Sequence, residues 1–413
     1  MNMYDVVVIG GGAAGMMAAI YASYNGAKVA IIEHNEKLGK KLYITGKGKC
    51  NLTNNSSVET HLNNIVTNSK FMFSALNNFS AQDTIEFFEN NGLKTRTERG
   101  NRVFPESDKS SDVIKTLVNC INNNNVKVTL NTEIERVYRD KDTFNILCKS
   151  GIIYTCKCLI IATGGLSYSG TGATGMGYEL AKQFGHNVVE PKPALCSIVV
   201  KEDISNLNGL SLRNVELSTK IGNKNHNQFG DLLFTYNSLT GPIALTLSSL
   251  INKFNLHGVK LYIDFKPALT ETHLEEKFKR EFVVNAKKDL KNYLHSLLPA
   301  KIIDYFMQKI KLPNKKLADI NKEERNSLIL GLKKFDFSIK SLDNINVGIV
   351  TSGGVDVKEI EPKTCQSKLV KNLFFAGEVL DVDALTGGFN LQVAWSTGVL
   401  AGTNAALIAK NIN

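Results

Sequence analysis

Three spaced glycines interrupt an apolar run near the start of the sequence. Gly10, Gly12 and Gly15 follow residues 6–9, which are all valine or isoleucine, and a small-residue stretch comes after them. Gly10 permits a sharp turn from strand to helix, Gly12 lets the backbone approach a pyrophosphate, and Gly15 lets the helix pack tightly on the strand. The N–H groups and positive dipole end of that helix favour phosphate. The spacing therefore predicts a dinucleotide-binding turn.

The next strand supports this interpretation. The helix is expected to stop at Asn25 and Gly26, and residues 28–33 follow as a strand that ends in Glu33. A carboxylate at this position accepts hydrogen bonds from both hydroxyls of an adenosine ribose and repels a 2′-phosphate. An ordinary glycine-rich turn would need no acid there, so we predict a Rossmann-type unit.

Two later segments indicate which dinucleotide binds. Residues 372–378 read as a short strand ending in Gly377 and Glu378, and a glycine-rich turn then enters a helix near Asn390. Residues 158–165 read as a further strand with an Ala-Thr-Gly end. NAD does not require the end of the chain to return to the nucleotide. The longer FAD needs a second contact, and the N–H groups at the start of a helix suit the N1 and O2 edge of the flavin. The three segments together predict FAD.

The sequence also resembles a known family of flavoproteins. It is similar to the BaiN-like proteins, also called YhiN-like or aminoacetone-oxidase-like, of the glutathione-reductase-type FAD fold. The resemblance covers nearly the whole chain, and its most specific motifs are Gly-Lys-Lys at 39–41, residues 44–54, 162–167 and 350–355, and the block 375–390. It implies non-covalent FAD and an α/β, Rossmann-like FAD-binding domain built from both chain ends, with an inserted β-rich plus helical domain.

Domain boundaries follow from the motifs and the charge pattern. We expect residues 1–190 and 346–413 to form the FAD-binding domain. The inserted substrate domain is expected over 191–345, β-rich to about residue 265 and helical from about residue 266.

The loop 45–51 is the best candidate for lining the flavin. Gly46 and Gly48 permit close approach, and Lys47 or Lys49 could stabilise the reduced anion. A nucleophilic Cys50 is an alternative, but no histidine is near in sequence, so packing is the better interpretation. The predicted cofactor-binding residues are Gly10, Gly12, Ala13, Ala14, Gly15, Glu33, Lys40, Lys41, Gly46, Cys50, Asn51, Ile134, Ala162, Thr163, Gly164, Gly377, Glu378, Asn390, Leu391 and Gln392.

Catalytic candidates are Tyr236, Asn237 and Lys49. Tyr236 stands where the family commonly has a histidine, so an acid or base role for Tyr236 is an open question. The loop that follows residues 162–165 lacks the proline that the family often has, and both departures bear on the substrate rather than on FAD.

A second glycine pattern, at 170–175, also fits the dinucleotide spacing. The strand before it ends near Thr163, several residues too early for the tight strand-turn-helix geometry. We therefore favour a flavin-side loop over a separate NAD(P)H site.

Composition and cysteine usage exclude several classes. The 413 residues are 43% apolar, enough for two or three domains. No stretch approaches the roughly 18 apolar residues of a membrane span, and the first strand begins at once, so we expect no signal peptide, no membrane contact and a cytoplasmic location. The seven cysteines are scattered, with no Cys-x-x-Cys and no metal pattern, so we expect reduced thiols and no metal.

The net charge of +10 is unevenly spread, because residues 266–340 contain 17 basic and 10 acidic side chains. A solvated helical face explains this, and attraction of an anionic partner such as RNA is the alternative. Few aromatics lie among the lysines, which disfavours stacking on single strands, so a nucleic-acid partner is not expected. The sequence leaves the oligomeric state undetermined.

The predicted activity is that of an FAD-dependent oxidoreductase. It would transfer a hydride between flavin N5 and a small organic substrate, or NAD(P)H docking transiently as electron donor. An aminoacetone or amine oxidase using O2, an FAD-dependent RNA-modifying protein and a non-catalytic flavin-binding module stay open as alternatives.

Overall fold

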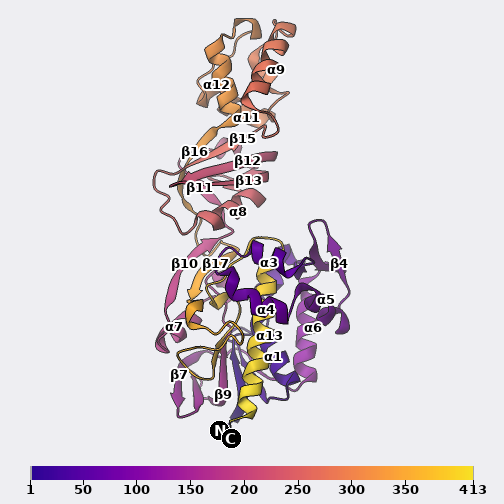
Figure 1. Ribbon diagram of the computed structural model, residues 1–413, viewed down its shortest axis with the longest axis vertical. Coiled ribbons are helices and arrows are strands. Elements are labelled where there is room, and N and C mark those ends of the chain that lie inside the picture. Colours follow the sequence, from indigo (N-terminus) through magenta and orange to yellow (C-terminus); the bar gives the residue numbers. More distant parts are fainter. Residues whose placement is uncertain (1, 413) are drawn as a thin grey trace. The chain divides into compact units, whose positions relative to one another are not determined.

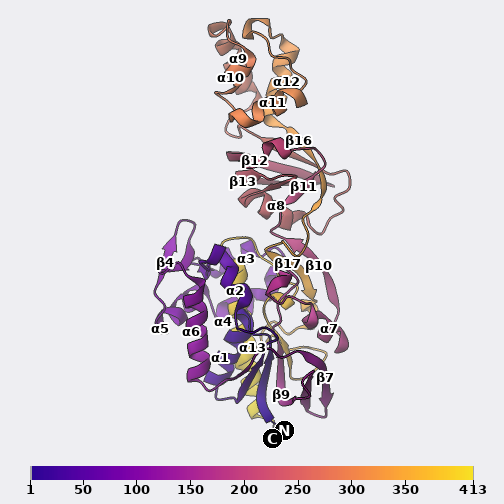
Figure 2. The same cartoon turned by 180° about the vertical axis from the view of Figure 1, so that it is seen from behind.

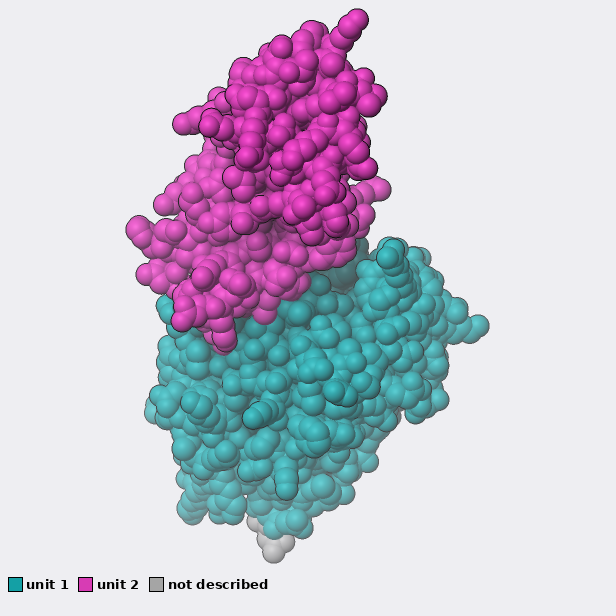
Figure 3. Space-filling view, turned by 45° about the horizontal axis from the view of Figure 1, so that its top comes forward, with its two compact units in different colours: residues 1–194, 345–413 teal, residues 195–344 magenta. Residues whose placement is uncertain are grey.

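Figures 1 and 2 show the computed structural model, which describes residues 2–412. The chain forms two compact units. Unit 1 comprises Met1–Ala194 and Ile345–Asn413, and unit 2 comprises Leu195–Asn344 (teal and magenta in Figure 3). Each unit has its own hydrophobic core. Unit 2 is therefore one continuous insertion into unit 1.

A seven-stranded sheet forms the centre of unit 1, in the order β6-β2-β1-β9-β8-β7, with β18 also paired to β9. Its central strands are buried on both faces, which is why they read as unbroken apolar runs. The strands are β1 (Asn2–Ile9), β2 (Val29–Ile32), β6 (Lys127–Thr129), β7 (Ile134–Asp140), β8 (Thr143–Cys148), β9 (Ile153–Ile161) and β18 (Leu373–Phe375).

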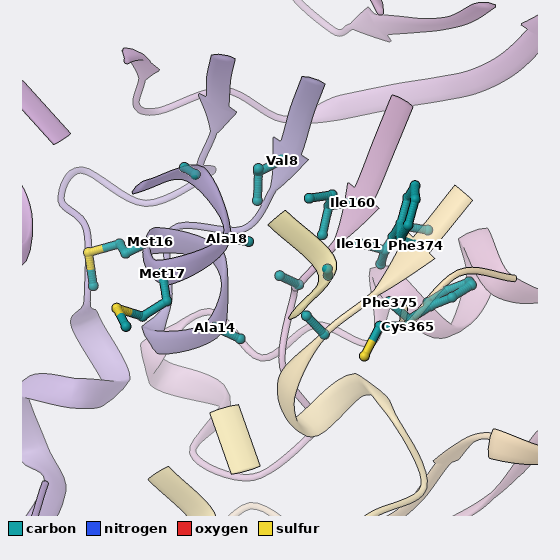
Figure 4. Packing of buried hydrophobic residues seen from close by; sticks show 14 of the residues in the cluster. Val8, Ala14, Met16, Met17, Ala18, Ile160, Ile161, Cys365, Phe374 and Phe375 are labelled. Carbon is teal, nitrogen blue, oxygen red and sulfur yellow. The ribbon is translucent and has the colours of Figure 1, made fainter. Parts of the chain in front are cut away.

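Four parallel strands of this sheet end on one line. Ile9 of β1 lies opposite Ile32 of β2 and Ile161 of β9, and Ile161 lies opposite Phe375 of β18. Figure 4 shows the side chains of the preceding row, with Val8 beside Ile160. The loops that follow these strands consequently leave the sheet at one edge, where ligands of open α/β sheets bind.

Helices α1 (Ala13–Tyr24) and α13 (Phe389–Lys410) pack closely against each other. A Cβ atom on Gly398 would lie 2.5 Å from the carbonyl oxygen of Ala14, and one on Gly402 would lie 2.1 Å from that of Ala18. Figures 1 and 2 both show α13, in yellow, beside α1. The last helix of the chain thus supports the helix of the glycine turn.

The remaining elements of unit 1 surround this centre. A small sheet runs β3-β5-β4, and β10 pairs with β17. The strands are β3 (Thr53–Asn54), β4 (Thr95–Glu98), β5 (Arg102–Pro105), β10 (Val188–Ala194) and β17 (Val350–Val355), and the helices are α2 (Lys40–Ile44), α3 (Val58–Asn64), α4 (Phe73–Asn78), α5 (Ala81–Asn90), α6 (Ser110–Asn123) and α7 (Met176–Gln183).

Unit 2 contains a closed barrel in the order β11-β14-β13-β12-β15-β16. Helix α8 (Pro242–Ile251) packs on β13. The barrel strands are β11 (Ile198–Val200), β12 (Ser211–Ile221), β13 (Lys224–Phe234), β14 (Ser238–Thr240), β15 (Lys260–Asp264) and β16 (Phe335–Leu342).

Four helices complete unit 2, and in both ribbon views they lie together at the end of the unit beyond β15. They are α9 (Glu271–Val284), α10 (Leu290–Leu294), α11 (Ala300–Lys309) and α12 (Lys322–Lys333). The expectation of a helical stretch from about 266 to 345 is wrong for β16, because Phe335, Phe337 and Ile339 alternate into the barrel core.

Candidate flavin site

The glycine turn shows which glycines the protein itself requires. Gly10 has φ +103°, and a Cβ atom there would lie 2.5 Å from the carbonyl oxygen of Ala162. A Cβ atom on Gly15 would lie 1.9 Å from the carbonyl oxygen of Gly10. A Cβ atom on Gly12 has no atom within 4 Å, and Gly12 precedes α1 with no side chain capping the helix. The turn therefore leaves room for a ligand at Gly12, where the first N–H groups of α1 are free to bind an anion.

The carboxylate of Glu33 is held in a fixed orientation directly after β2. The N–H of Gly11 donates to its Oε2 at 2.7 Å, and Asn35 donates to its Oε1 from both backbone and side chain at 2.8 Å. The residue is only 6% exposed. These bonds link the end of β2 to the glycine turn.

A partly buried network joins four segments that are far apart in sequence. The Lys41 ammonium on α2 lies 2.6 Å from Glu378 Oε2 and 2.6 Å from Ser167 Oγ. The Ser167 hydroxyl and the N–H of Thr351 donate to Glu378 Oε1 at 3.0 and 2.8 Å. In turn, Thr351 Oγ1 accepts from the N–H of Leu166 and of Ser167. The loops after β9 and β18 are thus tied to α2 and β17.

Burial alone would raise the pKa of Glu378. The neighbouring Lys41 ammonium and the hydrogen bonds from Thr351 and Ser167 outweigh that effect and hold the pKa below its ordinary value. Glu378 is therefore a carboxylate at neutral pH.

The segment 51–54 is fastened to the start of α13. The Trp395 indole N–H donates to the carbonyl of Leu52 at 2.9 Å, and the Thr53 hydroxyl donates to Gln392 Oε1 at 2.6 Å. A Cβ atom on Gly388, the residue before α13, would lie 2.4 Å from the backbone of Thr53. The Gln392 side chain is fully buried and also hydrogen-bonds Thr84, Ser396 and the carbonyl of Phe79. Its backbone N–H donates to the carbonyl of Gly388, so Gln392 positions this segment.

The first turn of α13 has no side-chain cap. The Asn390 amide instead holds its own loop, through the N–H and carbonyl of Ala384 and the carbonyl of Leu385. The backbone N–H groups of Asn390 and Leu391 remain the predicted ligand contacts, since they belong to the unpaired first turn of a helix.

One buried polar atom in this region lacks a partner. Asn51 Oδ1 is buried and has no hydrogen-bond partner among residues 2–412. Asn51 directly precedes the segment fastened to α13. FAD carries hydroxyl and ring N–H donors that a carboxamide oxygen can accept, and its pyrophosphate suits the open space at Gly12. The residues present therefore fit FAD.

Lys49 keeps its predicted catalytic role as a prediction, whereas the surroundings of Cys50 argue against a nucleophile. The Lys49 ammonium is half exposed and lies 3.1 Å from Asp108 Oδ2. Cys50 is fully buried at φ +59°, and burial raises the pKa of its thiol to about 12. The thiol stays protonated at neutral pH, which removes the nucleophile interpretation and leaves packing beside Gly46.

Tyr236 and Asn237 lie in unit 2, whereas all predicted cofactor-binding residues lie in unit 1. They occupy the turn between β13 and β14, which is closed by the hydrogen bond from Thr235 N–H to the carbonyl of Ser238. Tyr236 is 72% exposed. Their catalytic role stays a prediction.

The loop 170–175 lies beside the Glu33 end of the site. A Cβ atom on Gly172 would lie 2.5 Å from both His34 and Asn35, and the Asn35 amide donates to the carbonyl of Thr171 at 3.1 Å. Lys40 also reaches Asn35, at 3.3 Å. Because Glu33 is the predicted ribose ligand, this arrangement favours a position of the loop 170–175 at the adenosine end of FAD, and not at the expected flavin side.

The other predicted residues surround the same edge of the sheet. The Ala162 N–H donates to the carbonyl of Ile9, and a Cβ atom on Gly377 would lie 2.6 Å from Ala14 Cβ. Thr163 Oγ1 is buried without a partner among the described residues and faces Gly177 of α7. Gly46 has φ +56°, and a Cβ atom there would lie 3.1 Å from the backbone nitrogen of Asn51. The predicted roles of Ala13, Ile134 and Gly164 stay predictions.

Sequence reasoning missed Ser167, Thr351 and Trp395 as site residues. Ser167 and Thr351 lie inside the motifs 162–167 and 350–355. A polar residue within a glycine-rich motif was therefore the signal that could have identified them. No local pattern links Trp395 to Leu52, because the contact spans 343 positions.

Comparison with known proteins identifies the family. A family model described as HI0933-like protein Rossmann domain matches residues 4–404. The chain belongs to this family. The HI0933-like chain is 31% identical over 402 residues to the ribosomal RNA dihydrouridine synthase of Escherichia coli (strain K12), which covers 96% of both chains. It is 28% identical to the 3-dehydro-bile acid delta(4,6)-reductase of Clostridium scindens, over 98% of this chain and 99% of the other.

Solved structures show the same fold. The 3-ketosteroid delta1-dehydrogenase of Sterolibacterium denitrificans matches 99% of this chain and 100% of its own, with a TM-score of 0.55 and 12% identity. The family and its relatives confirm the predicted flavoprotein family, the α/β Rossmann-type fold and FAD as cofactor. The HI0933-like chain is an FAD-dependent oxidoreductase.

Membrane-spanning helices and metal sites were the two remaining features to compare with the sequence-based expectations, within residues 2–412. No helix in this range combines the length and apolar character that a membrane crossing needs. No group of three or more histidine, cysteine or acidic side chains in this range is arranged to hold a metal ion.

Proposed function

We propose that this protein reduces a carbon–carbon double bond conjugated to a carbonyl, and that its substrate is a uracil base in ribosomal RNA. Two relatives support the reaction class. A dihydrouridine synthase saturates a ring double bond conjugated to a carbonyl, and the bile acid reductase acts on double bonds conjugated to a 3-keto group. Both reactions add a hydride to one carbon and a proton to its neighbour.

The charge of unit 2 favours an RNA over a small neutral substrate. Unit 2 contains 23 lysine and arginine residues against 16 acidic residues, so it carries +7 of the total +10. Polyanions bind such surfaces through their phosphates, and these contacts need no aromatic stacking. The shortage of aromatics among the lysines therefore disfavours single-strand stacking but leaves phosphate contacts to RNA available. With such a substrate, we propose a cytoplasmic location.

The residues of unit 1 would hold FAD without a covalent bond. Gly12 and the start of α1 suit the pyrophosphate, Glu33 the ribose, and Asn51 and the start of α13 the flavin ring. FAD, when bound and reduced, supplies the hydride for this reaction class. Lys41 keeps Glu378 ionised, and we assign NAD(P)H as the transient donor that replaces the hydride.

The test uses rRNA transcribed in vitro, which carries no modification, incubated anaerobically with the holoenzyme and NADPH. We expect NADPH oxidation that depends on RNA, and nucleosides that have gained the mass of two hydrogen atoms at uridine. Gly12→Val is the control, because it removes the cofactor site without touching unit 2. NADPH oxidation without any dihydrouridine contradicts an RNA substrate.

A small-molecule enone is the second candidate, supported by the similarity to the bile acid reductase. The same assay with a 3-keto-4-ene steroid in place of RNA separates the two. Turnover of the steroid with no product on rRNA would favour this candidate.

A further inference from the structure

Two lysine pairs are brought side by side in the helical part of unit 2. Residues 286–291 read Ala-Lys-Lys-Asp-Leu-Lys, and residues 314–318 read Asn-Lys-Lys-Leu-Ala. The two segments run antiparallel and are joined by backbone hydrogen bonds from Leu290 N–H to the carbonyl of Lys315 and from Leu317 N–H to the carbonyl of Lys288. Together they carry five lysines and one aspartate. We name these two segments the lysine platform.

Folding creates this concentration of charge, since 22 residues separate the two segments in sequence. Like charges placed on adjacent antiparallel segments destabilise the fold. Three of the lysines are compensated: Lys291 by Asp304 at 2.6 Å, Lys315 by Glu324 at 2.6 Å, and Lys316 by Asp289 at 3.0 Å. The remaining two carry the excess charge of the platform.

Those two lysines are free to bind an anion. Lys287 and Lys288 are exposed, and within the described residues neither has a carboxylate in ion-pair distance. The preceding end of α9 is also exposed, with Val283 and Val284 at 78% and 82% and Arg280 one turn before them. This edge therefore presents three positive side chains, and none of them forms an ion pair with another described residue.

The platform rests on a rigid base. Leu290 and Leu317 are buried beneath it. The rings of Phe278 and Phe282 on α9 pack with the ring of Tyr293 on α10, and their centroids lie 5.3 to 6.0 Å apart. A fixed backbone limits the conformational entropy that the lysines lose on binding.

We infer that the lysine platform is a docking surface for the phosphate backbone of RNA, with Lys287 and Lys288 contacting phosphates outside the cofactor site. This inference rests on the proposed function. Two exposed valines offer too little apolar area to anchor the chain on a membrane, whereas adjacent ammonium groups match the repeating charges of a polynucleotide. Such contacts fix affinity and orientation without reading sequence.

The experiment compares a double variant, Lys287→Ala with Lys288→Ala, with a matched control, Lys220→Ala with Lys224→Ala. The control pair lies at the β12–β13 hairpin of the same unit, is equally exposed and changes the net charge equally. The affinity of each holoenzyme for rRNA transcribed in vitro is measured over a series of salt concentrations. Flavin absorbance and flavin reduction by NADPH without RNA should be unchanged in all of them.

The slope of log affinity against log salt should be shallower by about 1.4 to 1.8 in the platform variant, since each phosphate contact contributes about 0.7 to 0.9. The control should keep the wild-type slope. Equal slopes in the wild-type and platform proteins, with dihydrouridine still formed, would overturn the docking surface and leave the proposed function standing. No rRNA binding by the wild-type protein would overturn both. Retention on vesicles of anionic phospholipid, lost in the platform variant while rRNA binding persists, would also overturn the docking surface.

Discussion

At the scale of single residues, the three glycines of the turn have different roles. Gly10 and Gly15 are required by the fold, because a Cβ atom on either would overlap the backbone. Gly12 has an ordinary backbone conformation and open space around it. Only Gly12 is therefore reserved for the ligand.

Gly12→Val should give a folded but colourless protein. The added Cβ has no protein atom within 4 Å, and the side chain occupies the space predicted for the pyrophosphate. Visible absorbance measures the bound flavin, and far-UV circular dichroism measures whether the protein is folded. Gly15→Val is the comparison, and it should fail to fold because its Cβ would lie 1.9 Å from a carbonyl oxygen. A yellow Gly12→Val protein with a normal flavin ratio would reject the assignment.

Lys41→Met should make the holoenzyme sensitive to mild acid. The folded-state pKa of Glu378 now lies below its ordinary value of 4.5, so the ion pair stabilises the fold above pH 4.5 and is lost only as the pH falls through the lower folded value. Without the ammonium the pKa of Glu378 rises, and removing one partner of this partly buried pair costs about 1 to 3 kcal/mol.

Urea unfolding at pH 7 and pH 5 measures the effect of Lys41→Met. The midpoint should fall at both pH values, and the pH at which flavin is released should move upward. Lys37→Met is the matched control, because Lys37 is exposed and is not a predicted cofactor-binding residue. Equal pH profiles for the two variants would contradict a stabilising role for the Lys41–Glu378 pair.

At the scale of elements, the contact of α1 with α13 depends on small residues on both helices. Gly398 and Gly402 are one turn apart, as are Ala14 and Ala18, so the two backbones approach closely. The helix that begins at the pyrophosphate site and the helix that begins at the flavin site are thereby fixed to each other.

Gly402→Val should destabilise unit 1 by about 1 to 3 kcal/mol, because its Cβ would meet the carbonyl of Ala18 and force the helices apart. The urea midpoint and the bound flavin should both decrease. Thr403→Val is the control, because Thr403 is a partly exposed residue of the same helix and valine has nearly the same shape as threonine. An unaltered midpoint for Gly402→Val would show that the contact is not tight in solution.

The elements near the glycine turn were predictable because their signals are local. The strand, the turn, the helix end at Asn25 and the acid Glu33 lie within 30 residues of one another. The strand β16 was missed because charged residues around it continue the helical pattern, and its Phe335 and Phe337 are explained only by the closed barrel. The Lys41–Glu378 pair spans 337 positions, so neither residue's sequence neighbourhood indicates its partner.

At the scale of the whole molecule, each unit has a separate core, and the predicted cofactor residues belong to unit 1 alone. Multi-domain proteins of this kind need not unfold in one step. FAD should therefore stabilise one unit selectively.

Calorimetry should show two transitions, with only one moved upward by FAD. At a free FAD concentration of 100 Kd the stabilisation of unit 1 is about 2.7 kcal/mol. The Gly12→Val protein should show both transitions at positions that FAD does not change. A single transition that shifts as a whole would contradict independent units.

The packing of α13 on α1 also has a consequence for biosynthesis. The ribosome makes α1 first and α13 only after the whole of unit 2. At a synthesis rate of about 5 to 20 residues per second, the two helices are separated by roughly 20 to 75 s. During that interval the small-residue face of α1 has no partner, and the flavin end of the cofactor site does not exist. The nascent chain can therefore acquire its cofactor only after unit 2 has emerged, and a chain that stops at the end of unit 2 cannot complete the site.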